Sequence, residues 1–307
     1  MLGLMLVFSS CEKTVDYNID DDIVKPVVYA FLSDSKAMVH LFWSSSYVSD
    51  NDEQEISNAS IMLYEGENSL GTLSHISDGI YELTGICPMA NVEYTITIDV
   101  PDYEGSIVAK TTMPAKVHAD LFVTKEYHYE EGWPEEWGYY TDNLNLVFDD
   151  PLGVSNYYSY NVDKIQYVEG FEYWDEEDIV RHTSSVSINN VNQLMYTELE
   201  HIILFNDKYI DGTRYEYVVN NLSVSYIYDT EIHEDKDVDS AFMVPHFKTV
   251  NYDYYKFYCD AVGQSQASFN TSEAYCVYSN VENGFGIFAA YCEVTDTVVV
   301  HRNAVME

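Results

Sequence analysis

Residues 92–100, "VEYTITIDV", alternate between apolar and polar side chains along their whole length. In an extended chain, successive side chains point to opposite faces, so all of the apolar ones share one face. They are Val92, Tyr94, Ile96, Ile98 and Val100. The alternation therefore predicts a β-strand with one face buried.

Further strand-like runs surround this stretch, and Gly, Asp or Asn residues separate them. Short strands about ten residues apart, with turns of this kind, are typical of a β-sandwich. We therefore predict an immunoglobulin/fibronectin-like or carboxypeptidase-regulatory-like β-sandwich over residues 26–115, with Pro114 at its exit. The runs are residues 26–33, 37–46, 59–73, 78–83 and 105–114.

Residues 116–307 are also rich in strand-like runs, but these runs are less regular. We predict a second, larger β-rich domain there, so the predicted fold class is mainly β. Residues 251–266 depart from the pattern because Tyr254, Tyr258 and Val262 recur at helical spacing. They predict one short helix within this domain.

The charge of the chain is strongly negative, with 14 Lys and Arg against 52 Asp and Glu. This balance argues against nucleic acid as a partner, because phosphate binding needs a basic surface. It also argues against adhesion to anionic lipid head groups. The chain is not a disordered acidic polymer, since it contains 29 Tyr, 13 Phe and 4 Trp.

Residues 1–10 begin with an apolar run and end in Ser9 and Ser10, directly before Cys11. The run is too short to span a bilayer, but it suits the apolar part of a secretory signal. Small residues before a cysteine resemble the lipobox of bacterial lipoproteins, in which the cysteine is lipidated. We therefore predict a signal peptide over residues 1–10, a lipid anchor on Cys11 and an acidic tether over residues 11–25. The alternative is a first strand with a buried cysteine.

The cysteine count agrees with a special role for Cys11, because the chain has five cysteines and an odd number leaves one without a disulfide partner. The other four are either small buried side chains or disulfide-bonded, and the sequence leaves both interpretations open. They are Cys87, Cys259, Cys276 and Cys292.

Residues 280–300, "NVENGFGIFAAYCEVTDTVVV", contain a glycine motif near the end of the chain. Gly284 and Gly286 flank Phe285 and predict a bend with the aromatic ring pointing inward. The stretch resembles the C-terminal signature of a family of Bacteroidota lipoproteins that is known only as a domain of unknown function. The "KPVVYAFLSD" and "FDDPLGVSNYYSYNV" segments are similar to that family as well.

The resemblance implies a surface lipoprotein of the outer membrane that faces the cell exterior and is encoded beside a TonB-dependent β-barrel transporter. Its expected role is that of an accessory substrate-binding or complex-forming partner in nutrient uptake, without catalytic residues. The alternatives are a structural or adhesive cell-surface module and an acidic hydrolase. The sequence contains no HExxH or GxSxG motif, so we predict that it is not an enzyme.

The loop at residues 132–140, "GWPEEWGYY", combines four aromatic side chains with two carboxylates. Exposed aromatic residues beside carboxylates suit the binding of a glycan, a peptide or a partner protein. The alternative is that the two tryptophans cover the core beneath a long loop. The predicted contact residues are Trp133, Trp137, Tyr139 and Tyr140.

Calcium is the one cofactor that the sequence suggests, and no other is predicted. Asp235, Asp237 and Asp239 occur at alternate positions, as the first ligands of a calcium loop do. The glycine and the distal glutamate that usually complete such a loop are missing. A solvated acidic loop is therefore the alternative interpretation.

Overall fold

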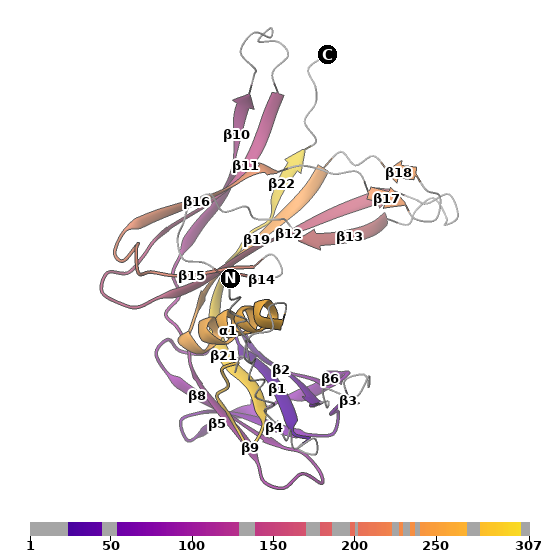
Figure 1. Ribbon diagram of the computed structural model, residues 1–307, viewed down its shortest axis with the longest axis vertical. Helices are drawn as coiled ribbons and strands as arrows, with labels where there is room; N and C mark the ends of the chain where they lie inside the picture. Colours follow the sequence, from indigo (N-terminus) through magenta and orange to yellow (C-terminus); the bar gives the residue numbers. More distant parts are fainter. Residues whose placement is uncertain are drawn as a thin grey trace, which may run out of the picture.

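The computed structural model is mainly β, as predicted, and its strands form two lobes that share one long sheet (Figure 1). The described part of the chain comprises residues 24–44, 54–128, 139–169, 179–185, 197–199, 202–222, 227–229, 234–236, 240–268 and 277–301.

The first lobe is a β-sandwich, and its core lies between two sheets. The alternation that predicted the strand at residues 92–100 places Tyr94, Ile96 and Ile98 in this core, where all three are buried. One sheet contains β1 (Pro26–Leu32), β2 (Lys36–Trp43), β3 (Gln54–Glu55), β6 (Ser74–Ser77) and β7 (Ile80–Thr84). The other contains β4 (Ser60–Glu65), β5 (Asn68–Thr72), β8 (Glu93–Asp99), β9 (Ile107–Thr112) and β20 (Val281–Glu282).

The second lobe also buries its core between two sheets. A three-stranded sheet contains β10 (Ala119–His128), β11 (Tyr139–Asp149) and β16 (Arg214–Leu222). It packs on part of the long sheet through a core rich in Tyr and Phe, which includes Phe148, Tyr158 and Phe247. That part contains β12 (Tyr157–Glu169), β13 (Ile179–Ser185), β14 (Thr197–Leu199), β15 (Ile202–Asn206), β19 (Ser240–Val250) and β22 (Val298–His301). A separate pair is β17 (Ile227–Asp229) and β18 (Glu234–Lys236).

Strand β21 (Phe285–Thr295) joins the two lobes. Its first half pairs with β1 in parallel, and its second half pairs with β19 in antiparallel orientation. Phe288 and Ala290 point into the core of the first lobe, whereas Ile287 and Ala289 pack beneath the helix on the other face. A strand that is buried on both faces needs a continuous apolar run, which explains the "FGIFAAYC" sequence of β21.

The segment between the lobes, residues 114–117, is fastened to the long sheet. The amide of Val117 donates a hydrogen bond to Thr249 Oγ1 at 3.1 Å, and Lys116 Nζ lies 2.9 Å from Asp34 Oδ2. The chain passes from the core of the first lobe to that of the second in this segment. The core of the first lobe is nevertheless completed by Phe288, Ala290 and Cys292 from the end of the chain, so residues 26–115 do not supply the whole of this core.

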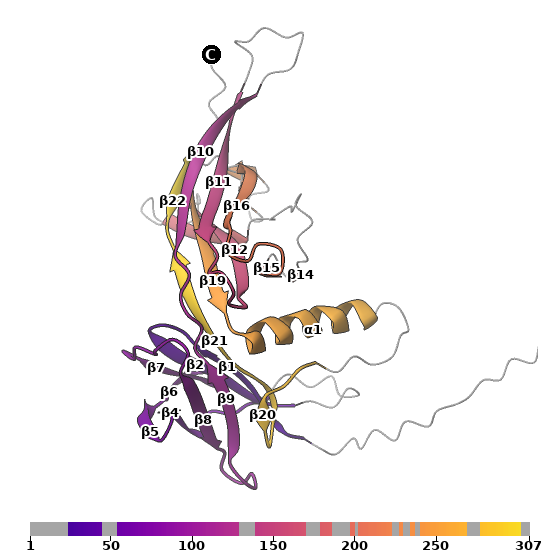
Figure 2. The ribbon, with the colours of Figure 1, turned by 90° about the vertical axis from the view of Figure 1, so that its left-hand side faces the viewer.

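Helix α1 (Tyr252–Ser268) confirms the helix that was predicted over residues 251–266. Asn251 caps it, because its Oδ1 accepts a hydrogen bond from the amide of Tyr254 at 3.1 Å. The helix projects from the side of the long sheet between the two lobes (Figure 2). Within the described residues, the structure has no helix that is both long and apolar enough to cross a membrane.

The glycine motif differs from its prediction, because Phe285 points outward and is 45% exposed, with Lys25 Nζ 5.4 Å from its ring centroid. The buried aromatic residue of the motif is Phe288. Gly286 has a φ of +108°, and a Cβ atom there would lie 2.1 Å from the carbonyl oxygen of Val28. The glycine is therefore required by the close approach of β21 to β1, and the bend turns the Phe285 ring away from the core.

Cys87, which is exposed, and Cys292, which is buried, are free thiols. Cys259 is half-buried on α1, and Cys276 lies outside the described residues. Burial raises the pKa of the Cys292 thiol to about 11, so this side chain is a neutral core residue.

Candidate functional site

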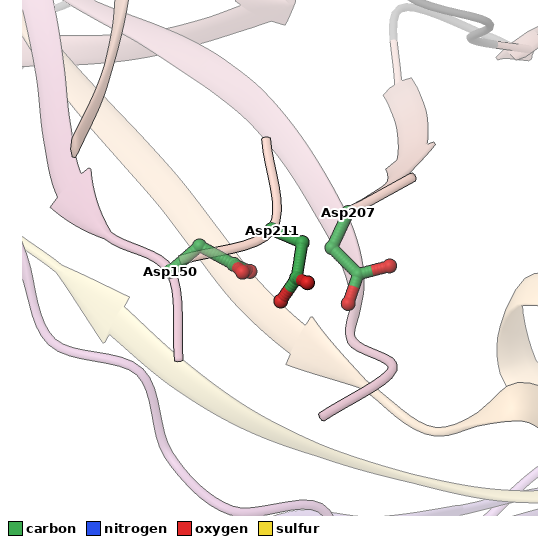
Figure 3. Close-up of side chains that lie close together, drawn as sticks. All are labelled: Asp150, Asp207 and Asp211. Atoms are coloured by element: carbon green, nitrogen blue, oxygen red, sulfur yellow. The ribbon is translucent and has the colours of Figure 1, made fainter. Parts of the chain in front are cut away.

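Three aspartates meet where two loops of the second lobe lie against each other (Figure 3). Asp150 follows β11 at the start of the loop that leads to β12. Asp207 and Asp211 lie in the loop between β15 and β16. One carboxylate oxygen from each residue lies within 4.8 Å of those of the other two. We call these residues the aspartate triad.

Each carboxylate of the aspartate triad is held by donors from the opposite loop or a neighbouring strand. Asp150 is buried and accepts hydrogen bonds from the hydroxyl of Tyr158 and, at 3.0 Å, from the amide of Gly212. Asp207 accepts from the amide of Asn156 at 2.6 Å. Asp211 accepts from the amide of Gly153 at 2.7 Å. The triad therefore fastens the two loops together.

The tyrosine beside Asp150 is held in its protonated form, as a hydrogen-bond donor, by its surroundings. Burial raises the pKa of the Tyr158 hydroxyl far above its ordinary value, and the hydrogen bond and negative charge of Asp150 raise it further. The proton of Tyr158 therefore stays available to the Asp150 carboxylate, which satisfies a buried charge.

Carboxylate oxygens are the ligands that Ca²⁺ prefers, and the triad supplies three of the six to eight that it usually takes. Asp150 already accepts a hydrogen bond on each of its two oxygens, and the other two accept one each. These hydrogen bonds connect the two loops, and that connection alone explains why the three carboxylates lie together. The triad can offer oxygens to a cation, but its geometry does not require one.

The predicted calcium residues lie elsewhere. Asp235 belongs to β18 and pairs with Tyr228 of β17, whereas Asp237 and Asp239 lie outside the described residues. Calcium binding at this segment therefore stays a prediction. No local pattern in the sequence predicts the triad, because its members come from two distant segments. The only local signal was the pair of aspartates four residues apart, directly before Gly212.

The predicted aromatic contact residues are described in part. Trp133 and Trp137 lie outside the described residues, as does Cys11. Tyr139 begins β11 opposite His128 of β10. Tyr140 is 48% exposed. Its ring centroid lies 5.0 Å from that of Tyr127, the residue opposite it on β10. The second of the two predicted tyrosines is therefore an accessible side chain near the end of the β10–β11 hairpin.

The amino-acid sequence matches a protein family described as Domain of unknown function (DUF4249) over residues 12–297. The chain is a member of the DUF4249 family. The match extends from before β1 into the segment after β21, so the matched region contains the aspartate triad, the β10–β11 hairpin and every described strand except β22. This finding confirms the resemblance to a domain of unknown function. No curated protein matches the sequence of the chain.

Proposed function

We propose that this protein is a surface-exposed lipoprotein, anchored in the outer membrane through Cys11, that acts beside a TonB-dependent transporter. In this proposal it binds a substrate for the transporter or forms a complex with it. The resemblance of residues 280–300 to the C-terminal signature of a lipoprotein family supports the proposal. The family match also begins at residue 12, directly after the cysteine that would carry the lipid.

The observation that carries the proposal is that the start of β1 and the β10–β11 hairpin lie at opposite ends of the molecule. Strand β1, the first of the described strands, runs parallel to β21 and begins at the end of β21 that is farther from the second lobe. The β10–β11 hairpin projects at the opposite end of the molecule (Figures 1 and 2). A lipid joined to β1 through the tether of residues 11–25 would therefore leave the hairpin at the opposite end free to contact a partner.

The surface of the hairpin supports a binding role. Tyr127 and Tyr140 are 39% and 48% exposed on one face of the hairpin, and Phe122 is 41% exposed on the other. Aromatic side chains that are accessible at the end of a rigid element are typical contact residues, because they bury much area with few rotatable bonds. The predicted loop at residues 132–140 connects the two strands at this end.

The test is co-purification of the tagged full chain from native membranes in mild detergent. We expect an outer-membrane β-barrel to co-purify with the wild type, and much less of it with a Trp133→Ala, Trp137→Ala double variant. Tyr209→Ala is the matched control, because Tyr209 is an aromatic residue of the second lobe that is 60% exposed outside the hairpin. Recovery of the chain without any β-barrel would contradict the transporter role. Equal recovery with the double variant would place the contact elsewhere.

A further inference from the structure

Four residues form a square on one face of the β10–β11 hairpin. Lys125 lies opposite Asp142, and Tyr127 lies opposite Tyr140, with an unbroken register between the two strands. Side chains two residues apart on a strand share a face, and this is the face that packs into the core of the second lobe farther along both strands. The square therefore lies where the core ends and the hairpin becomes accessible.

Asp142 is the unusual member of the square. Its side chain is only 4% exposed, yet its Oδ1 atom has no hydrogen-bond partner in the described structure. Lys125 Nζ lies 3.8 Å from this oxygen, which is beyond hydrogen-bonding distance, and the lysine side chain is 63% exposed. A buried carboxylate oxygen that lacks a donor is costly, so such an atom suggests a ligand that supplies one.

The two tyrosines add a second feature beside this carboxylate. Their ring centroids are 5.0 Å apart, and both rings are accessible to solvent. Tyr140 and Asp142 lie two positions apart, or about 7 Å along the strand. A cation that donates to Asp142 can therefore also lie within about 6 Å of an aromatic ring, which is the range of a cation–π contact.

We propose that Asp142, Tyr127 and Tyr140 form a binding site for an alkylammonium group, such as a lysine side chain of a partner protein or a small organic amine. The proposal names the ligand class of the hairpin, and only its biological setting rests on the proposed function.

A cation fits the site better than a neutral ligand for three reasons. Its N–H groups donate a charge-assisted hydrogen bond to Asp142, which a sugar hydroxyl does less strongly. The faces of both tyrosine rings attract positive charge. The net charge of −38 concentrates cations around the whole chain. A neutral sugar would gain only stacking and one ordinary hydrogen bond.

The ammonium group of Lys125 competes with an external ammonium group for the carboxylate of Asp142. Its ammonium group is the cation closest in the square to Asp142, but it is exposed and makes no hydrogen bond to Oδ1. An incoming ammonium group displaces it toward solvent. The removal of the lysine charge should therefore strengthen ligand binding, whereas a purely structural ion pair between Lys125 and Asp142 predicts no such gain.

The test is a calorimetric titration of the purified full chain in mild detergent with n-butylammonium chloride, at constant ionic strength. We expect saturable binding of the amine, no binding of n-butanol, and a loss of affinity of about tenfold or more in Asp142→Asn. Lys125→Met should bind several-fold more tightly than the wild type. Phe122→Ala, on the opposite face of β10, is the control and should bind as the wild type does.

The outcomes separate this proposal from the transporter role. Equal affinity in Asp142→Asn, no gain in Lys125→Met, or equal binding of n-butanol would overturn the ammonium site, whatever co-purifies with the chain. Thermal unfolding of Asp142→Asn at or above the wild-type Tm would show that its loss of affinity is not a loss of fold. Preference for Nα-acetyl-lysine amide over n-butylammonium would identify a lysine side chain as the ligand, and equal affinity would identify a small amine.

Discussion

At the scale of single residues, two neighbouring tyrosines differ in how their hydroxyl groups are satisfied. Tyr158 donates to Asp150, whereas the hydroxyl of Tyr160 is buried and has no hydrogen-bond partner among the described residues. We expect Tyr158→Phe to destabilise the protein by about 1–3 kcal/mol and Tyr160→Phe to be neutral or stabilising by up to about 1 kcal/mol. Urea unfolding of both variants is the measurement, and equal losses would contradict the assignment.

At the same scale, Glu293 makes the stability of the folded protein depend on pH. Burial opposes its ionisation, but the hydrogen bond from His246 at 2.8 Å and the charge of Lys248 at 3.9 Å lower its pKa below the ordinary value of 4.5. A carboxylate with a lowered pKa in the folded state stabilises the protein above its unfolded pKa, and this contribution is lost as the pH falls through the folded pKa.

We therefore expect Glu293→Gln to lower the Tm at pH 7, with a difference from the wild type that shrinks as the pH falls below about 4. Thermal unfolding at several pH values is the measurement, and Glu216→Gln at an exposed strand position is the control. A difference that is constant down to pH 2 would show that the charge of Glu293 does not contribute.

At the scale of elements, β21 determines how the lobes are joined, and Gly286 is its most constrained position. A Cβ atom at Gly286 would collide with the backbone of Val28, whereas one at Gly66 would meet nothing within 4 Å although φ is also positive there. We expect Gly286→Ala to cost at least about 3 kcal/mol and Gly66→Ala only about 1 kcal/mol. Denaturant unfolding measures both, and similar costs would contradict the close approach of β21 to β1.

The same strand decides whether the first lobe folds alone. A fragment of residues 24–116 lacks Phe288, Ala290 and Cys292, which belong to its core, and leaves the edge of β1 unpaired. We expect this fragment to unfold without cooperativity, and addition of residues 277–297 through a flexible linker to restore a cooperative transition. Circular dichroism during thermal unfolding is the measurement. A cooperative transition of the short fragment would contradict the role of β21.

Elements that depend on local patterns are predictable from the sequence, whereas contacts between distant segments are not. Alternation along residues 92–100 and helical spacing along residues 251–266 are local patterns, and both predicted their elements correctly. The pairing of β1 with β21 joins residues more than 250 positions apart, so no local pattern encodes it. The aspartate triad was missed for the same reason, because the loops that form it meet only in the folded chain.

At the scale of the whole molecule, the two lobes lie one after the other along a shared sheet, with β1 in the first lobe and the β10–β11 hairpin at the far end of the second (Figures 1 and 2). The net charge of −38 disfavours contact of either lobe with anionic head groups, so a lipid on Cys11 would be the sole attachment to the membrane. The proposed binding surface is then the β10–β11 hairpin, and the proposed function depends on that position.

Site-specific photo-crosslinking in native membranes tests this claim most directly. A photoreactive residue replaces either Tyr140 on the hairpin or Ile76 in β6 of the first lobe, which are 48% and 60% exposed. The account predicts a crosslink to an outer-membrane β-barrel from position 140 but not from position 76, and its loss when Cys11→Ala removes the anchor. A crosslink to the β-barrel from position 76 alone, or none from either position, would contradict the account.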